Sequence, residues 1–119
     1  AQKILIVDDE IDLARLLQIN LELNGYEVII AHDGRQGIKL ATSDKPDLII
    51  LDISLPDMDG LQICEALKRA PLTHNIPILM CTVKKMVGDV NKAFSLGASG
   101  YIVKPFKIEN VLKKIKDII

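Results

Sequence analysis

A chain of 119 residues has the length of one ordinary domain with a single hydrophobic core. Because 49% of its residues are hydrophobic and 26% are charged, the composition predicts a folded, soluble domain and excludes a disordered segment. No apolar run approaches the roughly 20 residues that cross a bilayer, so we expect no membrane association and a cytoplasmic location. The two cysteines, Cys64 and Cys81, lack metal-ligand spacing and are expected to be reduced core thiols.

Charge is distributed unevenly, although the formal net charge is only −1. Residues 1–83 carry seven basic and thirteen acidic side chains, whereas residues 84–119 carry eight lysines and three acidic side chains. Such asymmetry is typical of a domain that meets different partners on different faces. The lysine-rich segment therefore indicates either a solvated surface or a face for an acidic partner.

Short apolar runs alternate with segments of helical spacing along the chain. The runs are rich in Ile, Val and Leu and end at polar, Gly or Pro residues, as parallel strands covered on both faces do. In chain order we expect a strand over 3–7, a helix ending at Asn24-Gly25, a strand over 26–30, a helix over 34–43, a strand over 47–51, a helix over 60–70, a strand over 77–81, a helix over 84–96 with Gly88 inside it, a strand over 100–103 and a helix over 106–118. The first helix is expected to bury a stripe made of Leu13, Leu16, Leu17, Leu21 and Leu23. Five strand-helix units predict one α/β domain over residues 1–119, with helices on both faces of a parallel sheet.

Polar residues follow four of the five expected strands. The carboxyl ends of parallel strands meet along one edge of the sheet, where ligands bind at the topological switch point. We therefore expect one pocket to collect Asp8, Asp9, Asp52, Thr82 and Lys104. Taken singly, each residue has a structural explanation, since an aspartate can cap a helix, as Asp59 is expected to do before Gly60. Their gathering at four strand ends favours a functional site.

The residue types fit the binding and transfer of a phosphoryl group. Crowded carboxylates raise the pKa of at least one of them unless a cation neutralises the cluster. Mg²⁺ prefers carboxylate, carbonyl and water oxygens, and a lysine ammonium with a threonine hydroxyl suits the remaining phosphoryl oxygens. No histidine, serine or cysteine is placed here as a nucleophile, so the sequence predicts that Asp52, nearest the centre, takes that role.

Four stretches complete the pattern: ILIVDDE (4–10), PDLIILDISLPDMDG (46–60), IPILMCT (76–82) and GASGYIVKPF (97–106). Together they resemble the receiver domain of two-component response regulators over essentially the whole chain. The resemblance implies a doubly wound, flavodoxin-like α/β fold, in which five helices flank a five-stranded parallel sheet of order 2-1-3-4-5. It also implies a signalling phosphoacceptor, not an enzyme with a separate substrate, which catalyses only its own phosphorylation and dephosphorylation.

The resemblance assigns roles at the strand ends. Asp52 would accept a phosphoryl group from a histidine kinase or a phosphotransfer protein. Mg²⁺, for which Mn²⁺ can substitute, would be held by Asp9 directly, by Asp8 through water, by Asp52, and by the backbone carbonyl of Ser54. Lys104 would pair with the carboxylate of Asp52 and then with the phosphoryl group.

The same resemblance implies how the signal leaves the site. The bond from Lys104 to Pro105 would be cis, Thr82 would move to hydrogen-bond the phosphoryl group, and Tyr101 would turn into the vacated space. The face made by the fourth helix, fifth strand and fifth helix would then change for a downstream protein, a C-terminal output domain or a phosphorylation-dependent dimer. Direct binding to nucleic acid or membrane is not implied. The alternative for Tyr101 is simple packing at the surface.

Two positions depart from the family pattern, and one acid of the loop has no role in it. Val83 stands where a small residue usually follows the threonine, and its β-branched side chain predicts slow reaction with small phosphodonors. Leu55 stands where methionine is usual, a volume-conserving change expected to be neutral. Asp57 is expected to be a solvated loop residue.

Three other functions share part of the pattern. A metal-dependent phosphatase with an aspartyl nucleophile would carry a second acid at position 54, where this chain has Ser54, and would need a capping insertion. A flavin-binding electron carrier would need a phosphate-binding loop after the first strand and more aromatic residues than two Tyr, two Phe and no Trp. A degenerate receiver, acting as a phosphorylation-independent binding module, is disfavoured because all five site residues are present.

Overall fold

The computed structural model describes residues 1–83 and 88–119, in which strands and helices alternate from end to end. The elements are β1 (Lys3–Val7), α1 (Ile11–Leu23), β2 (Glu27–Ala31), α2 (Gly34–Asp44), β3 (Leu48–Asp52), α3 (Gly60–Arg69), β4 (Ile78–Val83), α4 (Asp89–Ser95), β5 (Gly100–Lys104) and α5 (Ile108–Ile118). The expected alternation is confirmed. The fourth helix begins after Gly88, so that glycine lies at its boundary and not inside it, and the expected residues 84–87 lie outside the described part.

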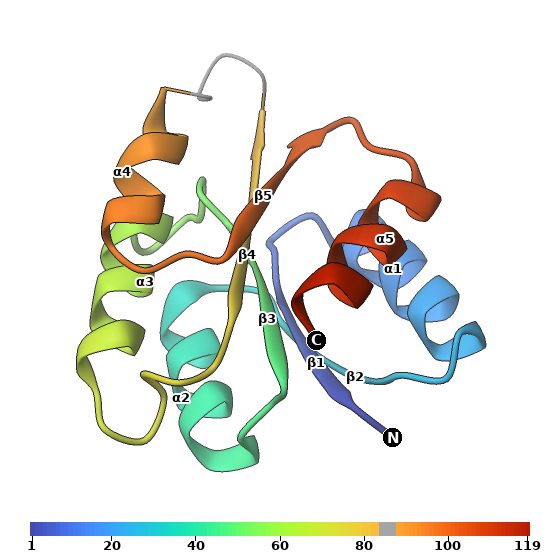
Figure 1. Ribbon diagram of the computed structural model, residues 1–119, viewed down its shortest axis with the longest axis horizontal. Coiled ribbons are helices and arrows are strands. Elements are labelled where there is room, and N and C mark those ends of the chain that lie inside the picture. Colours follow the sequence, from blue (N-terminus) through green and yellow to red (C-terminus); the bar gives the residue numbers. More distant parts are fainter. Residues whose placement is uncertain (84–87) are drawn as a thin grey trace.

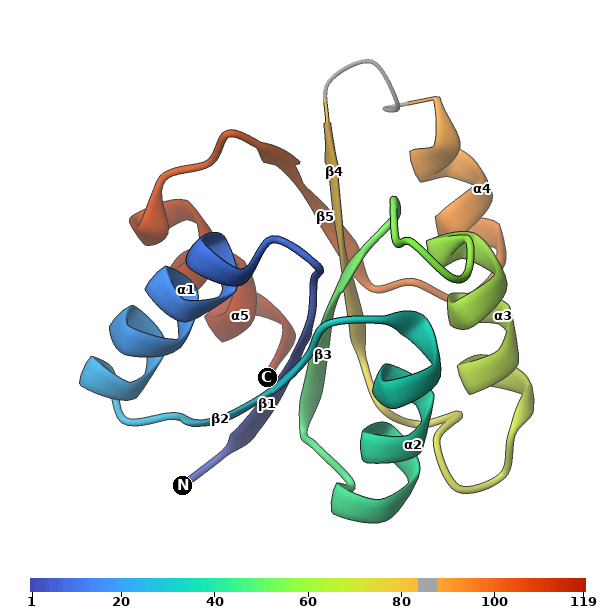
Figure 2. The same ribbon diagram turned by 180° about the vertical axis from the view of Figure 1, so that it is seen from behind.

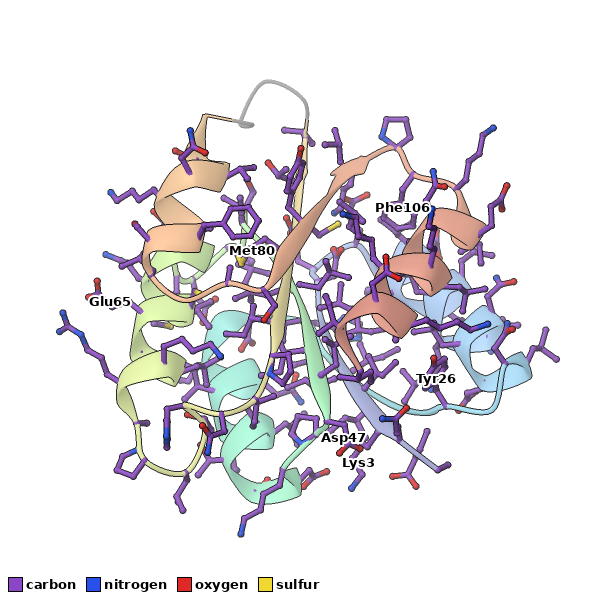
Figure 3. The ribbon with its side chains drawn as sticks, in the orientation of Figure 1. Lys3, Tyr26, Asp47, Glu65, Met80 and Phe106 are labelled. Atoms are coloured by element: carbon purple, nitrogen blue, oxygen red, sulfur yellow. The ribbon has the colours of Figure 1, made fainter. Side chains whose placement is uncertain are left out.

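One parallel sheet forms the centre of the molecule, with the order β2-β1-β3-β4-β5 that the family resemblance implied. Helices α1 and α5 cover one face of the sheet, and α2, α3 and α4 cover the other (Figures 1 and 2). All strands run in the same direction, so their carboxyl ends share one edge. At the opposite edge, the backbone N–H of Lys3 donates to the carboxylate of Asp47 over 2.7 Å, and Figure 3 shows both residues there.

The core has two layers, one on each face of the sheet. Strand β3 is buried along its whole length, and its side chains alternate between the layers, as its continuous apolar run predicts. Met80 of β4 packs in the layer beneath α3 and α4 (Figure 3), whereas Cys81 packs in the layer beneath α1 and α5. Both cysteines are buried and free, as expected.

Helix α1 buries only part of the stripe that was expected. Ala14, Leu17 and Leu21 face the sheet, but Leu16 is 50% exposed and Leu23 is 78% exposed. The helical period puts residues 14, 17 and 21 on one side, and a small alanine lets the helix approach the sheet closely. The end of the helix is as expected, because Gly25 adopts a left-handed φ of 90° directly after it. In the described ranges, no helix is long and apolar enough to cross a membrane.

Candidate functional site

The predicted site residues gather at the carboxyl edge of the sheet. In the strand register, Val7 lies opposite Leu51, and Asp52 lies opposite Cys81. Lys104 ends β5 opposite Val83. The strands therefore end side by side, and Asp8, Asp52 and Thr82 are buried there although they are polar.

Lys104 holds three carboxylates together. Its ammonium nitrogen Nζ lies 2.8 Å from Oε1 of Glu10, 3.0 Å from Oδ2 of Asp8 and 3.1 Å from Oδ2 of Asp52. An ammonium has three N–H donors, so all of them can be used. Burial alone lowers the pKa of Lys104, but the hydrogen bonds to Glu10 and Asp8 outweigh it and hold that pKa above its ordinary value. The lysine is therefore charged at every pH at which the domain would work.

Backbone donors fix the other oxygens of two carboxylates. Oδ1 of Asp52 accepts from the N–H of Ser54 over 3.1 Å, and Oδ1 of Asp8 accepts from the N–H of Glu10 over 2.9 Å. Burial raises the pKa of Asp52, Lys104 partly opposes this, and the neighbouring Asp8 adds to it. The site thus holds the Asp52 carboxylate in place at an electrostatic cost that a bound cation would relieve.

The donor set fits a hard divalent cation. Asp8, Glu10 and Asp52 each offer a carboxylate oxygen, and these atoms lie within 4.8 Å of one another. Oxygen ligands of this kind, completed by water, are those that Mg²⁺ takes. The structure does not bring Asp9 into this cluster and leaves it exposed, so its role as a direct metal ligand stays a prediction, as does that of the Ser54 carbonyl.

Glu10 is the site residue that sequence reasoning missed. The hydrogen bond from its N–H to Asp8 turns the chain so that residues 8 and 10 present their carboxylates to Lys104. The available signal was the third acid of the run at residues 8–10, but the resemblance drew attention only to the first two. One of the three carboxylates in direct contact with Lys104 therefore belongs to an unexpected residue.

The residues expected to respond to the phosphoryl group lie on the neighbouring strands. The hydroxyl of buried Thr82 donates to the backbone carbonyl of Val83 over 3.1 Å. Tyr101 is half-buried, with its ring edge-on to Phe94 at 6.3 Å and 6.0 Å from Nζ of Lys114. The structure therefore describes Tyr101 in contact with α4 and α5. The peptide bond from Lys104 to Pro105 is cis, as expected.

A groove of about 370 Å³ opens beside Lys104. Val83 forms part of its wall together with Glu10 and Phe106, and the Val83 side chain is partly exposed there. Figure 3 shows Phe106 on the segment that joins β5 to α5. A β-branched side chain thus stands beside the lysine, and the slow reaction with small phosphodonors expected from Val83 stays a prediction.

The loop that follows Asp52 is fixed at both of its aspartates. Asp59 caps α3, since its Oδ1 accepts from the N–H of Leu61 over 2.9 Å, as expected. Asp57 is exposed in the loop, as expected, but its carboxylate also accepts from the N–H of Gly34 over 2.7 Å and of Arg35 over 3.0 Å, which was not predicted. The bond from Gly34 holds the pKa of Asp57 below its ordinary value. Asp57 therefore caps α2 from a distant loop, a contact that local sequence does not reveal.

Gly60 lets α3 begin directly against the end of β3. A Cβ at this position would lie 2.5 Å from the carbonyl oxygen of Asp52 and 2.6 Å from Cα of Ile53. The N–H of Gly60 also donates to the carbonyl of Ile53 over 2.8 Å. The absence of a side chain therefore helps to set the backbone that presents Asp52.

This geometry belongs to a known class of domain. Residues 4–116 match the family model of the response regulator receiver domain, and the chain belongs to that family. A protein of Bacillus subtilis (strain 168), the alkaline phosphatase synthesis transcriptional regulatory protein PhoP, is 45% identical over 118 residues, which are 99% of this chain and 48% of that protein. The DNA-binding dual master transcriptional regulator RpaA of Synechocystis is 41% identical over 117 residues, 98% of this chain and 48% of that protein.

Solved structures agree with the sequence relatives. The chemotaxis protein CheY4 of Vibrio cholerae superposes with a TM-score of 0.93 at 33% identity, covering 99% of this chain and 98% of that one. The match extends over the whole sheet and its helices, so the chain has the fold of that protein. The chain spans about half the length of the curated relatives it matches.

Proposed function

We propose that this receiver domain accepts a phosphoryl group on Asp52 from a phosphohistidine of a histidine kinase or phosphotransfer protein. The observation that supports this most directly is the buried carboxylate of Asp52, 3.1 Å from Nζ of Lys104 and within the carboxylate cluster. A carboxylate oxygen attacks phosphorus, the bond from phosphorus to the histidine nitrogen breaks, and its electron pair returns to the imidazole ring. The product is an acyl phosphate on Asp52.

The neighbouring groups have distinct tasks in this reaction. Asp8, Glu10 and Asp52, with Asp9 and the Ser54 carbonyl as further ligands, would hold Mg²⁺, which would neutralise charge on the phosphoryl oxygens. The ammonium of Lys104 exchanges its contact with Asp52 for a phosphoryl oxygen. Water later attacks phosphorus, which breaks the bond to Asp52 and restores the carboxylate. The domain catalyses only these two steps on itself.

The signal passes through Thr82 and Tyr101 in this proposal. The Thr82 hydroxyl exchanges its bond to the Val83 carbonyl for a phosphoryl oxygen, and Tyr101 then turns inward and leaves Phe94. The face made by α4, β5 and α5 changes as a result. Identical Tyr101 rotamers with and without beryllium fluoride, a phosphoryl analogue, would exclude this coupling.

The donor protein is proposed to dock on α1. Ile11, Leu16, Ile19 and Leu23 expose apolar side chains on this helix, whose first residue follows Glu10 of the site. Exposed apolar side chains gathered on one helix support a protein interface there. Because the relatives are about twice as long and are named as transcriptional regulators, we also propose that the signal reaches a DNA-binding output domain.

Phosphorylation of the purified domain tests the function. Wild type, Asp52→Asn and the control Asp57→Asn are incubated with acetyl phosphate and Mg²⁺, and intact mass is measured. We expect one added phosphoryl group on wild type and the control and none on Asp52→Asn. An unmodified wild type would indicate the degenerate receiver, and multiple turnover of a phosphate ester would indicate the aspartyl phosphatase.

A further inference from the structure

Glu10 joins the carboxylate cluster to the groove beside Lys104. Of the three carboxylates that contact Lys104, those of Asp8 and Asp52 are buried, whereas the Glu10 side chain is 59% exposed. Among the described residues that line the groove, Glu10 is the one acid and Lys104 is the one base. Oε1 of Glu10 contacts Lys104, so the carboxylate has its second oxygen to offer to a molecule that enters the groove.

The other walls of the groove are apolar. They are formed by Leu13 of α1, by Val83 of β4, and by Pro105 and Phe106 after β5. A small flat ring with an N–H group on its edge fits such a groove, because the walls cover the faces of the ring and the carboxylate accepts from the N–H. Imidazole is a ring of this kind, and a volume of about 370 Å³ admits it.

The groove lies where the leaving group of a phosphodonor would depart. In phosphoryl transfer the attacking and leaving atoms lie roughly in line, on opposite sides of phosphorus. Asp52 is buried, so a donor attacked by its carboxylate departs on the exposed side of the site. Lys104 is 3.1 Å from Asp52 and also lines the groove. Ile11, directly after Glu10, belongs to the exposed apolar side of α1 on which the donor protein is proposed to dock.

We propose that the carboxylate of Glu10 contacts the phosphohistidine ring of the donor and selects this donor over those with an anionic leaving group. Glu10 accepts a hydrogen bond from the N–H of one ring nitrogen while the bond between phosphorus and the other ring nitrogen breaks. The electron pair of the broken bond returns to the ring, which then leaves as neutral imidazole. Without that proton the ring would leave as an imidazolate anion, which is a far poorer leaving group.

The charges around the groove make this contact selective. Lys104, the other charged residue that lines it in the described ranges, disfavours a protonated ring, and the carboxylate of Glu10 offsets that effect. Acetyl phosphate releases an acetate anion, which has no N–H to donate and is repelled by Glu10. This inference rests on the proposed function, because it assigns Glu10 a task in the transfer to Asp52.

The alternative role of Glu10 is that of a cation ligand alone. Loss of a ligand weakens Mg²⁺ binding and slows transfer from every donor alike. Loss of a hydrogen bond to the ring slows transfer only from donors whose leaving atom is a ring nitrogen. Two donors of different leaving group, compared at saturating Mg²⁺, therefore separate the two roles.

The test measures the phosphorylation rate of the domain by intact mass, with phosphoimidazole and with acetyl phosphate as the donors. Glu10→Gln keeps the length of the side chain and still accepts from Lys104. We expect this variant to react about tenfold more slowly with phosphoimidazole and no more than about twofold more slowly with acetyl phosphate. The control Asp12→Asn, which removes an exposed acid from the first turn of α1, should leave both rates within about twofold of wild type.

The pH profile supplies a second measurement. The rate of wild type with phosphoimidazole should persist to higher pH than that of Glu10→Gln, because the carboxylate favours the protonated ring of the donor. Both proteins should show the same profile with acetyl phosphate. Identical profiles of the two proteins with phosphoimidazole would overturn the proposal.

The rates themselves also decide against the proposal in defined cases. A phosphoimidazole rate of Glu10→Gln within about twofold of wild type would overturn it. An equal loss with both donors, together with weaker Mg²⁺ binding in titration calorimetry, would assign Glu10 to the cation alone and leave the proposed function intact. A wild type that neither donor modifies would reject the proposed function and this role of Glu10 with it.

Discussion

Replacing Lys104 by methionine removes the charge at the centre of the site while keeping most of the side-chain volume. The Lys104 side chain is only 9% exposed, and its partners Asp8 and Asp52 are 4% and 8% exposed. Glu10, the third partner, is 59% exposed. The variant therefore leaves two carboxylates buried together without a cation, and the third can turn to water.

The expected loss of stability follows from these exposures. Removing one partner of a buried ion pair costs about 3–5 kcal/mol, whereas an exposed pair contributes about 1 kcal/mol or less. Protonation of Asp52, whose pKa burial already raises, limits the damage. We therefore expect a loss of about 3 kcal/mol in the free energy of unfolding of Lys104→Met at neutral pH without metal.

The stability lost in Lys104→Met should depend on pH in a definite direction. In wild type the pKa of Lys104 is raised, so the contribution of the lysine is fully present below the ordinary pKa of lysine and is lost only above it. In the variant, Asp8 and Asp52 repel each other when both are ionised, so the deficit shrinks as the pH falls and protonates one of them. The deficit should be larger at about pH 8 than at about pH 5.

Urea unfolding followed by circular dichroism measures the free energy of unfolding of wild type and Lys104→Met at both pH values, with EDTA and with Mg²⁺. Lys107→Met is the matched control, because Lys107 is exposed and has no ion pair in the described ranges. Mg²⁺ should restore part of the stability of Lys104→Met, since a cation replaces the lost one. A loss no larger than that of the control, or one that is equal at both pH values, would refute the reasoning.

Three further substitutions test the surroundings of the site. Gly60→Ala should cost about 1–3 kcal/mol in urea unfolding, because its Cβ meets the Asp52 backbone, while Gly88→Ala, with open space around it, should stay within about 1 kcal/mol; equal effects would contradict this. Val83→Ala should speed phosphorylation by acetyl phosphate by up to about fivefold, as a barrier lower by about 1 kcal/mol would, and an unchanged or lower rate would contradict the prediction. Asp57→Asn should speed hydrogen exchange of the Gly34 amide. In wild type the same cap should weaken only below about pH 4, because the lowered pKa of Asp57 keeps its carboxylate charged above that pH. If neither the substitution nor the lower pH changed the exchange protection of the Gly34 amide, the cap would be contradicted.

The fold could be predicted because its signals are local. Apolar runs of strand length, each stopped by a polar residue, identify the strands, and parallel strands must end at one edge. Asp52, Thr82 and Lys104 therefore came together as expected. The strand order itself came from the family resemblance and not from periodicity.

What escaped prediction depends on contacts between distant segments. Glu10 reaches Lys104 only because its own N–H bonds to Asp8, and no pattern in the sequence signals that turn. Asp57 finds its partners at Gly34 and Arg35, more than twenty positions earlier in the chain. On α1, the expected stripe contained the buried Leu17 and Leu21 but also the exposed Leu16 and Leu23. It left out Ala14, which is buried where the helix packs on the sheet.

The caps made by Asp57 and Asp59 anchor the loop after Asp52, so this side of the pocket is held more firmly than the opposite side, at the end of β4. The loop after Asp52 is hydrogen-bonded to the starts of both α2 and α3. The lack of a side chain at Gly60 lets this loop pack directly against the end of β3. On the other side, within the described ranges, the Thr82 hydroxyl donates to the next carbonyl of its own strand, that of Val83. If Asp52 accepts a phosphoryl group as proposed, we expect the displacement to travel toward β4 and β5, because the loop after Asp52 has more side-chain anchors than the end of β4. In that proposal, Asp57 and Asp59 would set the direction of the displacement without contacting the phosphoryl group.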